Sequence, residues 1–342
     1  MEFLYNYGLF LAQAVTIVLS IVAVIIGATA VTSKPKSQHG EIEVEDISEY
    51  LEDVKHQFEE KVLSKEALKT KQKAQKKAQK AADKAPAEDK PRLFVVNFIG
   101  SMDAREVTSL REEVTAILTI ANKEDEVLLK IDSGGGVVHG YGLAASQVSR
   151  IKDANIPLTV AVDKVAASGG YMMACVADKI IAAPFAIVGS IGVLAQLPNF
   201  SKLLKKHDID YEQFTAGDYK RTVTMFAENT DKGRAKFKEE LEETHVLFKS
   251  FVYGHRPSLD IESVATGEHW FGTDAHKKGL VDHIQTSDDY MIDKAKTHKV
   301  FGVKCSVKKG MAEKLGLSMS IAADRLLSKW WQRSEANATN IQ

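Results

Sequence analysis

The stretch that organises the chain is Val165-Ala166-Ala167-Ser168-Gly169-Gly170-Tyr171-Met172-Met173-Ala174. An apolar, β-branched run from Leu158 to Val162 comes before it, and an apolar segment with helical spacing follows the serine. Where a strand turns sharply into a helix, a serine at the turn exposes its hydroxyl, and small residues are needed two positions before and after it. Ala166 and Gly170 occupy these positions. The pattern therefore predicts that Ser168 is a nucleophile.

Length and composition limit the class of protein. The chain of 342 residues is long enough for one large or two medium-sized domains, and a hydrophobic content of 44% allows a sizeable core. The formal net charge of -1 argues against nucleic acid as a partner. The two cysteines, Cys175 and Cys305, stand in apolar contexts, which favours buried thiols over a disulfide. The cysteines therefore do not indicate a cellular compartment.

The N-terminal region is strongly apolar. No charged residue occurs from residue 3 to residue 33, and the apolar run over residues 9–31 is long enough to span a hydrocarbon core of about 30 Å. Residues 1–33 are therefore predicted to form a helix anchored in the lipid bilayer. The alternative is a cleaved signal peptide, because Ala28-Thr29-Ala30 resembles a cleavage site. The length of the run, and the absence of Lys and Arg before it, favour the anchor.

A charged linker is predicted over residues 34–91. Lys34 and Lys36 favour a cytoplasmic position for the rest of the chain, but two lysines leave the side of the membrane open. Residues 65–84, rich in Ala, Lys and Gln, are predicted to be a solvated helix or disordered, and a spacer in solvent is favoured over a basic surface on anionic lipid. A short amphipathic helix is predicted earlier in the linker from the spacing of Leu51, Val54, Phe58 and Val62.

From residue 92 onward, strand patterns alternate with helix patterns. Apolar runs predict buried strands, and amphipathic segments predict the helices between them. This alternation is typical of an α/β core with right-handed crossovers. The predicted segments, in chain order, are a strand at 93–98, a helix at 106–121, a strand at 126–131, a helix at 141–151 and a strand at 158–162.

The remaining segments complete a predicted domain of residues 92–300 and a C-terminal part of residues 301–342. Residues 180–200 are uncharged, but the Pro and Gly residues among them favour buried strands and loops under the active site over a second membrane span. The later patterns predict a strand at 207–214, a long charged helix at 231–253, a short helix between 272 and 279, a strand at 301–307 and an amphipathic helix at 311–331.

Three consecutive glycines, Gly134, Gly135 and Gly136, follow the strand predicted at 126–131. They fit neither the Gly-x-Gly-x-x-Gly pattern nor a loop that ends in Gly-Lys-Ser/Thr, which argues against a phosphate cradle. A plain tight turn is one interpretation. An oxyanion hole is the other, because glycines leave the backbone able to direct an N–H at developing negative charge. A second glycine-rich strand end at 169–170 favours the oxyanion hole, since each end would supply one N–H.

A serine nucleophile needs a general base. Ten histidines are present, but none stands in a context typical of a triad, and His139 and His269 are the nearest candidates. No His, Cys and Asp residues have metal-ligand spacing, so no metal is expected. A lysine can act as the base if burial lowers its pKa toward neutrality. The lysines considered are Lys164, Lys179 and Lys220, the last because Tyr219, Val223 and Phe226 can cover it.

Four motifs resemble the signal peptide peptidase A family of membrane serine–lysine peptidases. Residues 131–136, Ile-Asp-Ser-Gly-Gly-Gly, resemble a family strand followed by Ser-Pro-Gly-Gly, with Gly134 in place of the proline. Residues 166–171 match the family's nucleophile motif, and residues 188–193 match the segment after it. Residues 270–275 with 279–282 resemble its closing motif. The similarity covers roughly residues 93–285, in the family's order.

The resemblance implies a site and a fold. It implies that Ser168 is the nucleophile, that Lys220 is the general base and that Ser190 orients the lysine amine. It also implies that the N–H groups of Gly135 and Gly169 form the oxyanion hole. The implied fold is α/β of the ClpP/crotonase-like type, a stack of ββα units. Family members assemble into rings or domes, so a homo-oligomer is expected.

The resulting hypothesis is an endopeptidase of the bacterial cell inner membrane with a single-pass anchor. It would cleave extended, largely apolar peptides, such as signal peptides or membrane-protein fragments, through an acyl-enzyme on Ser168 and without a cofactor. Two alternatives stay open. One is a crotonase-like acyl-CoA enzyme, because that fold also uses two backbone N–H groups. The other is a non-catalytic membrane scaffold.

Overall fold

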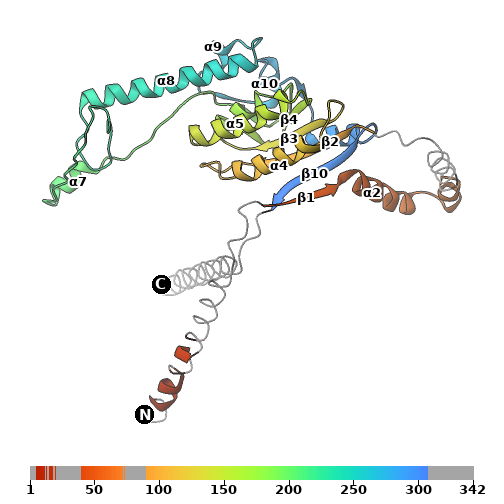
Figure 1. Cartoon of the computed structure of the whole chain (residues 1–342), viewed down its shortest axis with the longest axis horizontal. Coiled ribbons are helices and arrows are strands. Elements are labelled where there is room, and N and C mark those ends of the chain that lie inside the picture. Colours follow the sequence, from red (N-terminus) through yellow and green to blue (C-terminus); the bar gives the residue numbers. More distant parts are fainter. Residues whose placement is uncertain are drawn as a thin grey trace, which may run out of the picture. The chain divides into compact units, whose positions relative to one another are not determined.

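The computed structural model of the chain describes residues 5–11, 13, 15–17, 20, 40–71, 73 and 90–306 (Figure 1). Contacts divide the chain into two units, residues 1–41 with 306–342, and Ile42–Cys305. Within the described residues, none of the helices has both the length and the apolar character needed to cross a membrane. Most of the predicted anchor, and the helix predicted at 311–331, lie outside the described residues.

The body of the chain is built on a seven-stranded sheet with the order β1-β10-β2-β3-β4-β6-β9. From β10 to β9 in this order, neighbouring strands are parallel. The central strands are buried on both faces, which explains their nearly continuous apolar sequences. The bounds are β1 Glu41–Asp46, β2 Arg92–Ile99, β3 Glu126–Asp132, β4 Leu158–Val162, β6 Lys179–Ala182, β9 His283–Ile284 and β10 Lys299–Ser306.

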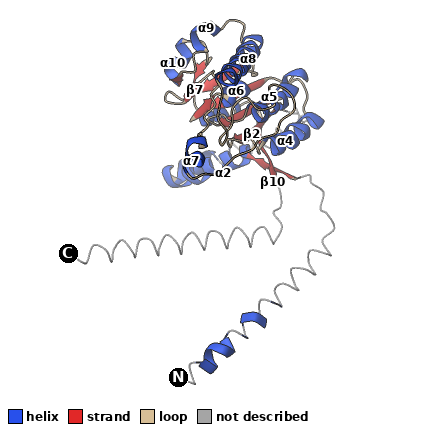
Figure 2. Cartoon of the chain, turned by 90° about the vertical axis from the view of Figure 1, so that its left-hand side faces the viewer, coloured by secondary structure: helices blue, strands red, loops and turns tan. Residues whose placement is uncertain are grey.

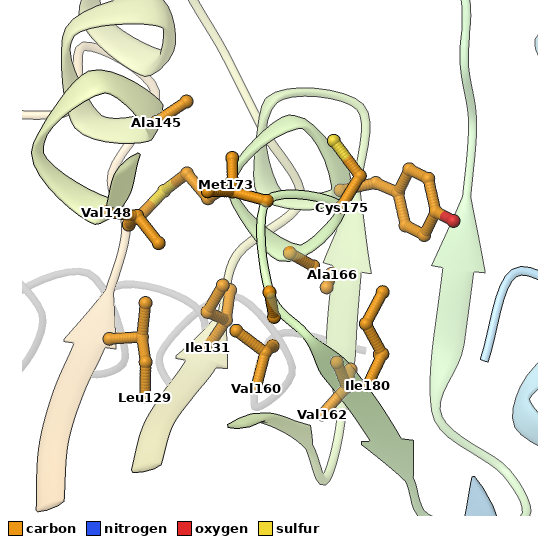
Figure 3. Packing of buried hydrophobic residues seen from close by; sticks show 14 of the residues in the cluster. Leu129, Ile131, Ala145, Val148, Val160, Val162, Ala166, Met173, Cys175 and Ile180 are labelled. Carbon is orange, nitrogen blue, oxygen red and sulfur yellow. The ribbon is translucent and has the colours of Figure 1, made fainter. Parts of the chain in front are cut away.

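Successive residues of these strands face two separate apolar clusters. Leu129 and Val160 belong to the larger cluster, together with side chains of α5 and α6 (Figure 3) and with others from α4 and α8. Their neighbours Leu128 and Ala161 belong to a smaller cluster that includes Tyr290 of α11. Helices therefore pack on both faces of the sheet (Figure 2). The bounds are α4 Val107–Ile120, α5 Val138–Asp153, α6 Gly169–Ala174, α8 Asp231–His255 and α11 Ser287–Lys294.

A second, three-stranded sheet has the order β5-β7-β8, with β7 parallel to β5 and antiparallel to β8. In the chain, β5 follows β4 and β7 follows β6, so each successive pair adds one strand to each sheet. Ser133, just after β3, forms a bridge with Ala166 of β5 and extends this pattern. The bounds are β5 Val165–Ala167, β7 Ile187–Gly189 and β8 His269–Phe271, with α9 Ile261–Val264 before β8 and α10 Gly272–Lys277 after it.

The strands and helices predicted from residue 93 to residue 162 are all present, with ends that shift by a few residues. The predicted α/β alternation is thus confirmed, and the paired strands show part of the predicted ββα stack. The strand that leads into Ser168 differs from the prediction, because β5 stands between β4 and the serine. The polar residues Asp163 and Lys164 form a bend where the chain passes from one sheet to the other.

Part of the range predicted as a charged linker forms regular structure. β1 lies at the edge of the large sheet beside β10, and α2 (Ile47–Val62) follows it. The sequence Glu-Ile-Glu-Val-Glu-Asp alternates as a half-exposed strand does, and its charges suit a sheet edge. Asp46 caps α2 by accepting a hydrogen bond from the Glu49 N–H. The helix predicted from the apolar spacing is confirmed, although none of its residues is fully buried.

Residues 192–230, called the arm below, join the end of β7 to α8 and extend away from the sheets (Figure 1). They contain one short helix, α7 (Ser201–Lys206). The strand predicted at 207–214 is wrong, because these residues form no strand. Their apolar and polar residues alternate, but no neighbouring strand is there to pair with their backbone groups. The long charged helix predicted after the arm is confirmed as α8.

The uncharged residues 180–200 divide into a buried and an exposed part. Strands β6 and β7 are largely buried, as predicted for this segment. Residues 194–200, in contrast, are exposed and form neither helix nor strand. The favoured interpretation of strands and loops is therefore correct for the order of elements. It is wrong for the burial of the last residues, because they already belong to the arm.

Candidate active site

Ser168 lies at the turn between β5 and α6, as the sequence predicts. It adopts φ 52° and ψ -118°, values that are rare for a residue with a side chain. Such a conformation costs about 1–3 kcal/mol and persists only where its surroundings hold it. The Ser168 N–H donates to the Gly189 carbonyl at 2.8 Å, and the Ser168 carbonyl accepts from the Met172 N–H at 3.0 Å. Contacts with β7 and α6 thus hold the strained turn in place.

The residues around Ser168 are small because the surrounding atoms leave no room for side chains. Ala166 is fully buried. A Cβ atom at Gly170 would lie 2.6 Å from the Ser133 carbonyl oxygen, and one at Gly169 would lie 2.3 Å from Cγ of Tyr141. The predicted need for small residues two positions before and after the serine is therefore confirmed.

The two glycine-rich strand ends meet beside Ser168. Gly135 has φ 85°, in the left-handed region that glycine adopts without strain. A Cβ atom at Gly135 would lie 2.6 Å from the Gly169 nitrogen and 2.8 Å from the Ser168 Cβ, so the two backbones are in direct contact. The Ala167 N–H donates to the Ser133 carbonyl at 3.0 Å, which ties the two strand ends together.

The two glycine-rich strand ends and Ser168 are called the junction below. The backbone N–H groups of the junction differ in whether they already donate a hydrogen bond. Gly169 is the first residue of α6, so its N–H has no acceptor within the helix, and none occurs elsewhere among the described residues. The Gly136 N–H likewise has no acceptor in the described part of the chain. The Gly135 N–H, in contrast, donates to the Ser133 Oγ at 3.1 Å. The structure thus brings Gly135 and Gly169 together, but of these two only Gly169 has an uncommitted N–H.

Ser190 follows β7 as Ser168 follows β5. The two strands pair with Ala167 opposite Gly189, so the two serines stand one residue beyond the same point of the small sheet. Ser190 also has a positive φ, 53°, and its N–H donates to the Glu268 carbonyl at 2.6 Å. The predicted lysine-orienting residue therefore lies next to the predicted nucleophile.

Lys220 lies in the arm, and its side chain is exposed. It lines a cavity of about 730 Å³ whose walls come from residues 197–226 alone, Val223 and Phe226 among them. No hydrogen bond joins Lys220 to Ser168 or Ser190 in the described structure. Within one chain, therefore, the structure brings together four of the five predicted site residues, and it leaves the lysine apart from them.

The other candidate bases either interact with other side chains or form no hydrogen bond with Ser168 in the described structure. Lys164 forms an ion pair with Asp132 at 3.1 Å and is largely exposed. The Lys179 ammonium lies over the Tyr290 ring, 5.5 Å from its centroid. His139 and His269 are exposed, and neither forms a hydrogen bond with Ser168 in the described structure. None of these side chains replaces Lys220 as the better candidate.

Two buried residues at the junction have no role in the sequence interpretation. Ser133 is 2% exposed and Tyr141 is 0% exposed, and their side-chain oxygens are 2.5 Å apart. The Tyr141 hydroxyl also donates to the Ser101 carbonyl at 2.8 Å. The signal in the sequence is a single aromatic residue between Gly140 and Gly142, at the start of a helix. That signal indicates close packing but not what the tyrosine contacts.

Both cysteines are buried and outside any disulfide, as predicted. Burial raises the pKa of the Cys175 thiol to about 12, so this group stays protonated at neutral pH and is not a nucleophile. No group of three His, Cys, Asp or Glu residues that could hold a metal ion occurs among the described residues. The reactive groups at the junction are therefore hydroxyls and backbone N–H groups.

The fold and the junction together indicate a hydrolase of the α/β class with a serine at a strained strand-to-helix turn. Comparison with family models defines the class further. Residues 2–148 match the model described as "Peptidase family S49 N-terminal", and residues 150–301 match "Peptidase family S49". The chain belongs to peptidase family S49, which confirms the predicted peptidase family and favours a peptidase over an acyl-CoA enzyme.

Two proteins of high sequence identity carry the same indication. The chain is 49% identical over 340 residues to "Probable protease SohB" of Haemophilus influenzae, and 96% of each chain is covered. It is also 49% identical over 308 residues to "Probable protease SohB" of Buchnera aphidicola subsp. Schlechtendalia chinensis, covering 86% of this chain and 100% of that one. A solved structure of the 1510-N membrane-bound stomatin-specific protease is 13% identical, with a TM-score of 0.40, over 66% of this chain and 96% of that one.

Proposed function

We propose that this peptidase cleaves peptide chains internally through an acyl-enzyme on Ser168, with Lys220 as the general base. The observation that carries the proposal is the Ser168 turn. A serine in a strained conformation precedes an uncommitted Gly169 N–H, and both lie against a second glycine loop. Strain of this kind clusters at active sites, where the rest of the fold maintains it.

In the proposed reaction, neutral Lys220 takes the proton of the Ser168 hydroxyl as the Oγ attacks the substrate carbonyl carbon. The carbonyl oxygen becomes an oxyanion, which backbone N–H groups stabilise. The lysine ammonium then gives its proton to the leaving amine, the C–N bond breaks, and an ester remains on Ser168. Water, deprotonated by the same lysine, attacks the ester carbon. The lysine ammonium then returns the proton to the Ser168 Oγ as the C–O bond breaks and the acid product leaves.

The proposed oxyanion hole combines the Gly169 N–H with an N–H from the loop of residues 134–136. The family resemblance assigns the second donor to Gly135, whose N–H donates to the Ser133 hydroxyl in the structure. A charged oxyanion is a stronger acceptor than a hydroxyl and would compete for this hydrogen. The Gly136 N–H, one residue further on, is the uncommitted donor of the same loop. We therefore assign the second donor to the loop as a whole.

We further propose that Lys220 reaches Ser168 from a second copy of the chain, in a homo-oligomer. The arm that carries Lys220 extends away from the sheets (Figure 1). It exposes many large apolar side chains, and monomeric soluble proteins rarely expose large apolar patches of this kind. Burial against a neighbouring copy would also give Lys220 the dry, apolar surroundings in which a lysine amine can act as a base. The exposed apolar residues of the arm are Leu194, Leu197, Phe200, Leu203, Ile209, Tyr211, Phe214, Tyr219 and Phe226.

The proposed setting is the bacterial inner membrane, with residues 1–33 as a single-pass anchor. The support is the absence of charge from residue 3 to residue 33. An enzyme held at the bilayer meets extended, apolar chains, so we propose signal peptides and membrane-protein fragments as substrates.

The test uses the full chain in detergent, with casein and a labelled signal peptide as substrates. Ser168→Ala and Lys220→Met are each expected to lower the cleavage rate by at least about 10³-fold. Lys232→Met is the matched control. Lys232, at the start of α8, is also close to the arm, since its Nζ lies 5.7 Å from the Tyr219 ring centroid, but it has no role in the proposed mechanism. Wild-type rates in both site variants would contradict the mechanism. A folded wild-type protein that neither cleaves nor reacts with a fluorophosphonate would indicate a non-catalytic scaffold.

A further inference from the structure

Tyr141 is linked to both halves of the proposed oxyanion hole, directly to Gly169 and through Ser133 to the glycine loop. On one side, its ring lies so close to Gly169 that a Cβ atom there would be 2.3 Å from Cγ of the tyrosine and 2.7 Å from its Cβ. The ring itself is fixed, because Phe98 packs against it edge to face, with centroids 6.3 Å apart. The side chain is fully buried in the larger apolar cluster. The position of Gly169 is therefore set by direct contact with this ring.

On the other side, the Tyr141 hydroxyl begins a chain of hydrogen bonds to the glycine loop. Its single proton can go to the Ser101 carbonyl at 2.8 Å, and the Ser133 hydroxyl, 2.5 Å away, then donates to the tyrosine oxygen. The Gly100 carbonyl, at 3.4 Å, is a weaker acceptor for the same serine proton. The Ser133 oxygen in turn accepts the Gly135 N–H at 3.1 Å. Burial raises the pKa of Tyr141, which keeps it protonated as this chain of bonds requires.

The bond from Gly135 to Ser133 closes the loop across Gly134. A Cβ atom at Gly134 would meet nothing within 4 Å, so the surroundings do not restrain this residue. Glycine also has more backbone freedom than the proline that the motif resemblance leads us to expect here. A serine oxygen that accepts from the N–H two residues later restricts a turn in a similar way. The hydrogen bonds through Ser133 therefore supply a rigidity that Gly134 by itself lacks.

From these contacts we infer that Tyr141 and Ser133 are positioning residues that set the spacing between the Gly169 N–H and the 134–136 loop. The inference rests on the proposed function, in which the two N–H groups stabilise the oxyanion. Oxyanion donors are effective at 2.7–3.1 Å from the charge they stabilise. A displacement of about 1 Å can cost about 10²-fold in rate. A buried tyrosine that contacts Gly169 directly and is linked to the 134–136 loop through Ser133 is well placed to prevent such a displacement.

The test compares Tyr141→Phe and Ser133→Ala with Tyr290→Phe in the full chain. Tyr141→Phe keeps the ring against Gly169 and removes only the hydroxyl. Tyr290 is the matched control, because it is also a buried tyrosine with a bonded hydroxyl but belongs to the cluster on the other face of the large sheet. The measured quantities are kcat and KM for a signal peptide, the affinity for a peptide aldehyde, and the melting temperature.

We expect Tyr141→Phe and Ser133→Ala each to lower kcat about tenfold, with KM changed less than about twofold, since the lost contacts matter mainly in the transition state. The aldehyde, which forms a tetrahedral adduct with the serine, should bind more weakly by a similar factor. The double variant should lose little more than either single variant, because both act through one chain of bonds. Tyr290→Phe should lower the melting temperature but leave kcat unchanged.

Two results would overturn the inference. One is a normal kcat in Tyr141→Phe. The other is a loss that Tyr290→Phe shares in proportion to its melting temperature, which would reveal a purely structural role. Ser168→Ala, assayed alongside, separates this failure from that of the proposed function. If Ser168→Ala is inactive and Tyr141→Phe is normal, only the positioning role fails, whereas an active Ser168→Ala overturns both.

Discussion

At the scale of a single residue, strained backbone and reactive hydroxyls occur together at the ends of the small sheet. Ser168 and Ser190 both have φ near 50°, and they follow neighbouring strands that pair at Gly189. The Ser168 N–H donates to the Gly189 carbonyl of β7, and the Ser190 N–H donates to the carbonyl of Glu268, just before β8. The fold therefore maintains at this point two conformations that an unconstrained serine would leave.

The strain predicts that glycine at position 168 gives a more stable protein than alanine does, the reverse of the order inside a helix. Ser168→Gly is expected to be about 1 kcal/mol more stable than Ser168→Ala, because glycine adopts φ 52° without a Cβ clash. Both variants should be inactive. At Ser149, inside α5, the same pair should show the opposite order, since glycine destabilises a helix interior by about 1 kcal/mol relative to alanine. Urea unfolding measures both differences, and equal stabilities of the two position-168 variants would argue against strain.

At the scale of an element, α8 links the arm to the body. Its N-terminus begins after Thr230, whose hydroxyl accepts from the Gly233 N–H at 3.1 Å. At its other end, Arg256 forms two hydrogen bonds to the Asp282 carboxylate, at 2.7 and 2.9 Å. The same carboxylate accepts the Ile180 N–H of β6 at 2.7 Å. One ion pair therefore ties the end of the long helix to the large sheet.

This ion pair predicts a pH dependence of stability. Burial alone would raise the pKa of Asp282, but the hydrogen bonds from Arg256 and Ile180 outweigh it and hold the pKa below its usual value. A depressed pKa contributes stability above the unfolded value of about 4, and this contribution is lost as pH falls through the folded value. Asp282→Asn should therefore cost about 2 kcal/mol at pH 7 and clearly less near pH 3.

Equilibrium unfolding in urea at the two pH values measures this change. Asp274→Asn is the control, because Asp274 pairs with Lys277 on the exposed surface of α10, and exposed pairs contribute little. If Asp282→Asn lowers the free energy of unfolding by the same amount at pH 7 and pH 3, an ionised Asp282 carboxylate is not what stabilises the fold at this point.

At the scale of the whole molecule, the arm separates the proposed base from the proposed nucleophile. Lys220 and the cavity it lines belong to the arm, whereas Ser168, Ser190 and both glycine loops belong to the sheets. In one chain, the proposed base and the proposed nucleophile therefore lie in different parts of the fold. In the proposed assembly, the arm of one copy would lie over the strand ends of another and bring the two together.

Mixing two inactive variants tests this assembly. When Ser168→Ala and Lys220→Met are co-expressed, a site with an intact serine from one copy and an intact lysine from the next should form. For random mixing of equal amounts, about a quarter of the sites would be intact in a head-to-tail ring. Cleavage of the labelled peptide measures the recovery, and each variant alone is the control. Co-purified mixtures that stay inactive would show that one chain supplies both residues.

A second variant tests the arm as an interface. Phe214 is 89% exposed, so Phe214→Ser should leave the stability of the body unchanged. If the arm packs against another copy, this variant should lower both the oligomer mass in light scattering and the cleavage rate. Phe58→Ser in α2, at a residue that is 69% exposed outside the arm, is the control. An unchanged mass for Phe214→Ser would argue against this part of the arm as a contact.

Much of the body could be predicted because its signals are local. The parallel strands are continuous apolar runs, the helices between them are amphipathic, and small residues surround Ser168. The strand prediction at 207–214 was wrong because it relied on a local signal alone. Alternation shows that a segment could form a strand, but a strand exists only where another strand pairs with it. The edge strand β1 was missed because its charges made it look like part of a linker.

The α/β class, the serine on its strand-to-helix turn and the peptidase family could all be predicted from the sequence, because each of these depends on residues that are near one another in the chain. Only the tertiary structure showed that Gly135 lies against Gly169, that Ser133 holds the Gly135 N–H, and that Tyr141 contacts both sides of the junction. It also placed Lys220 in an arm apart from the serine. These relations depend on how two sheets, a helix and a long connection pack in space, and spacing along a chain does not encode such distances.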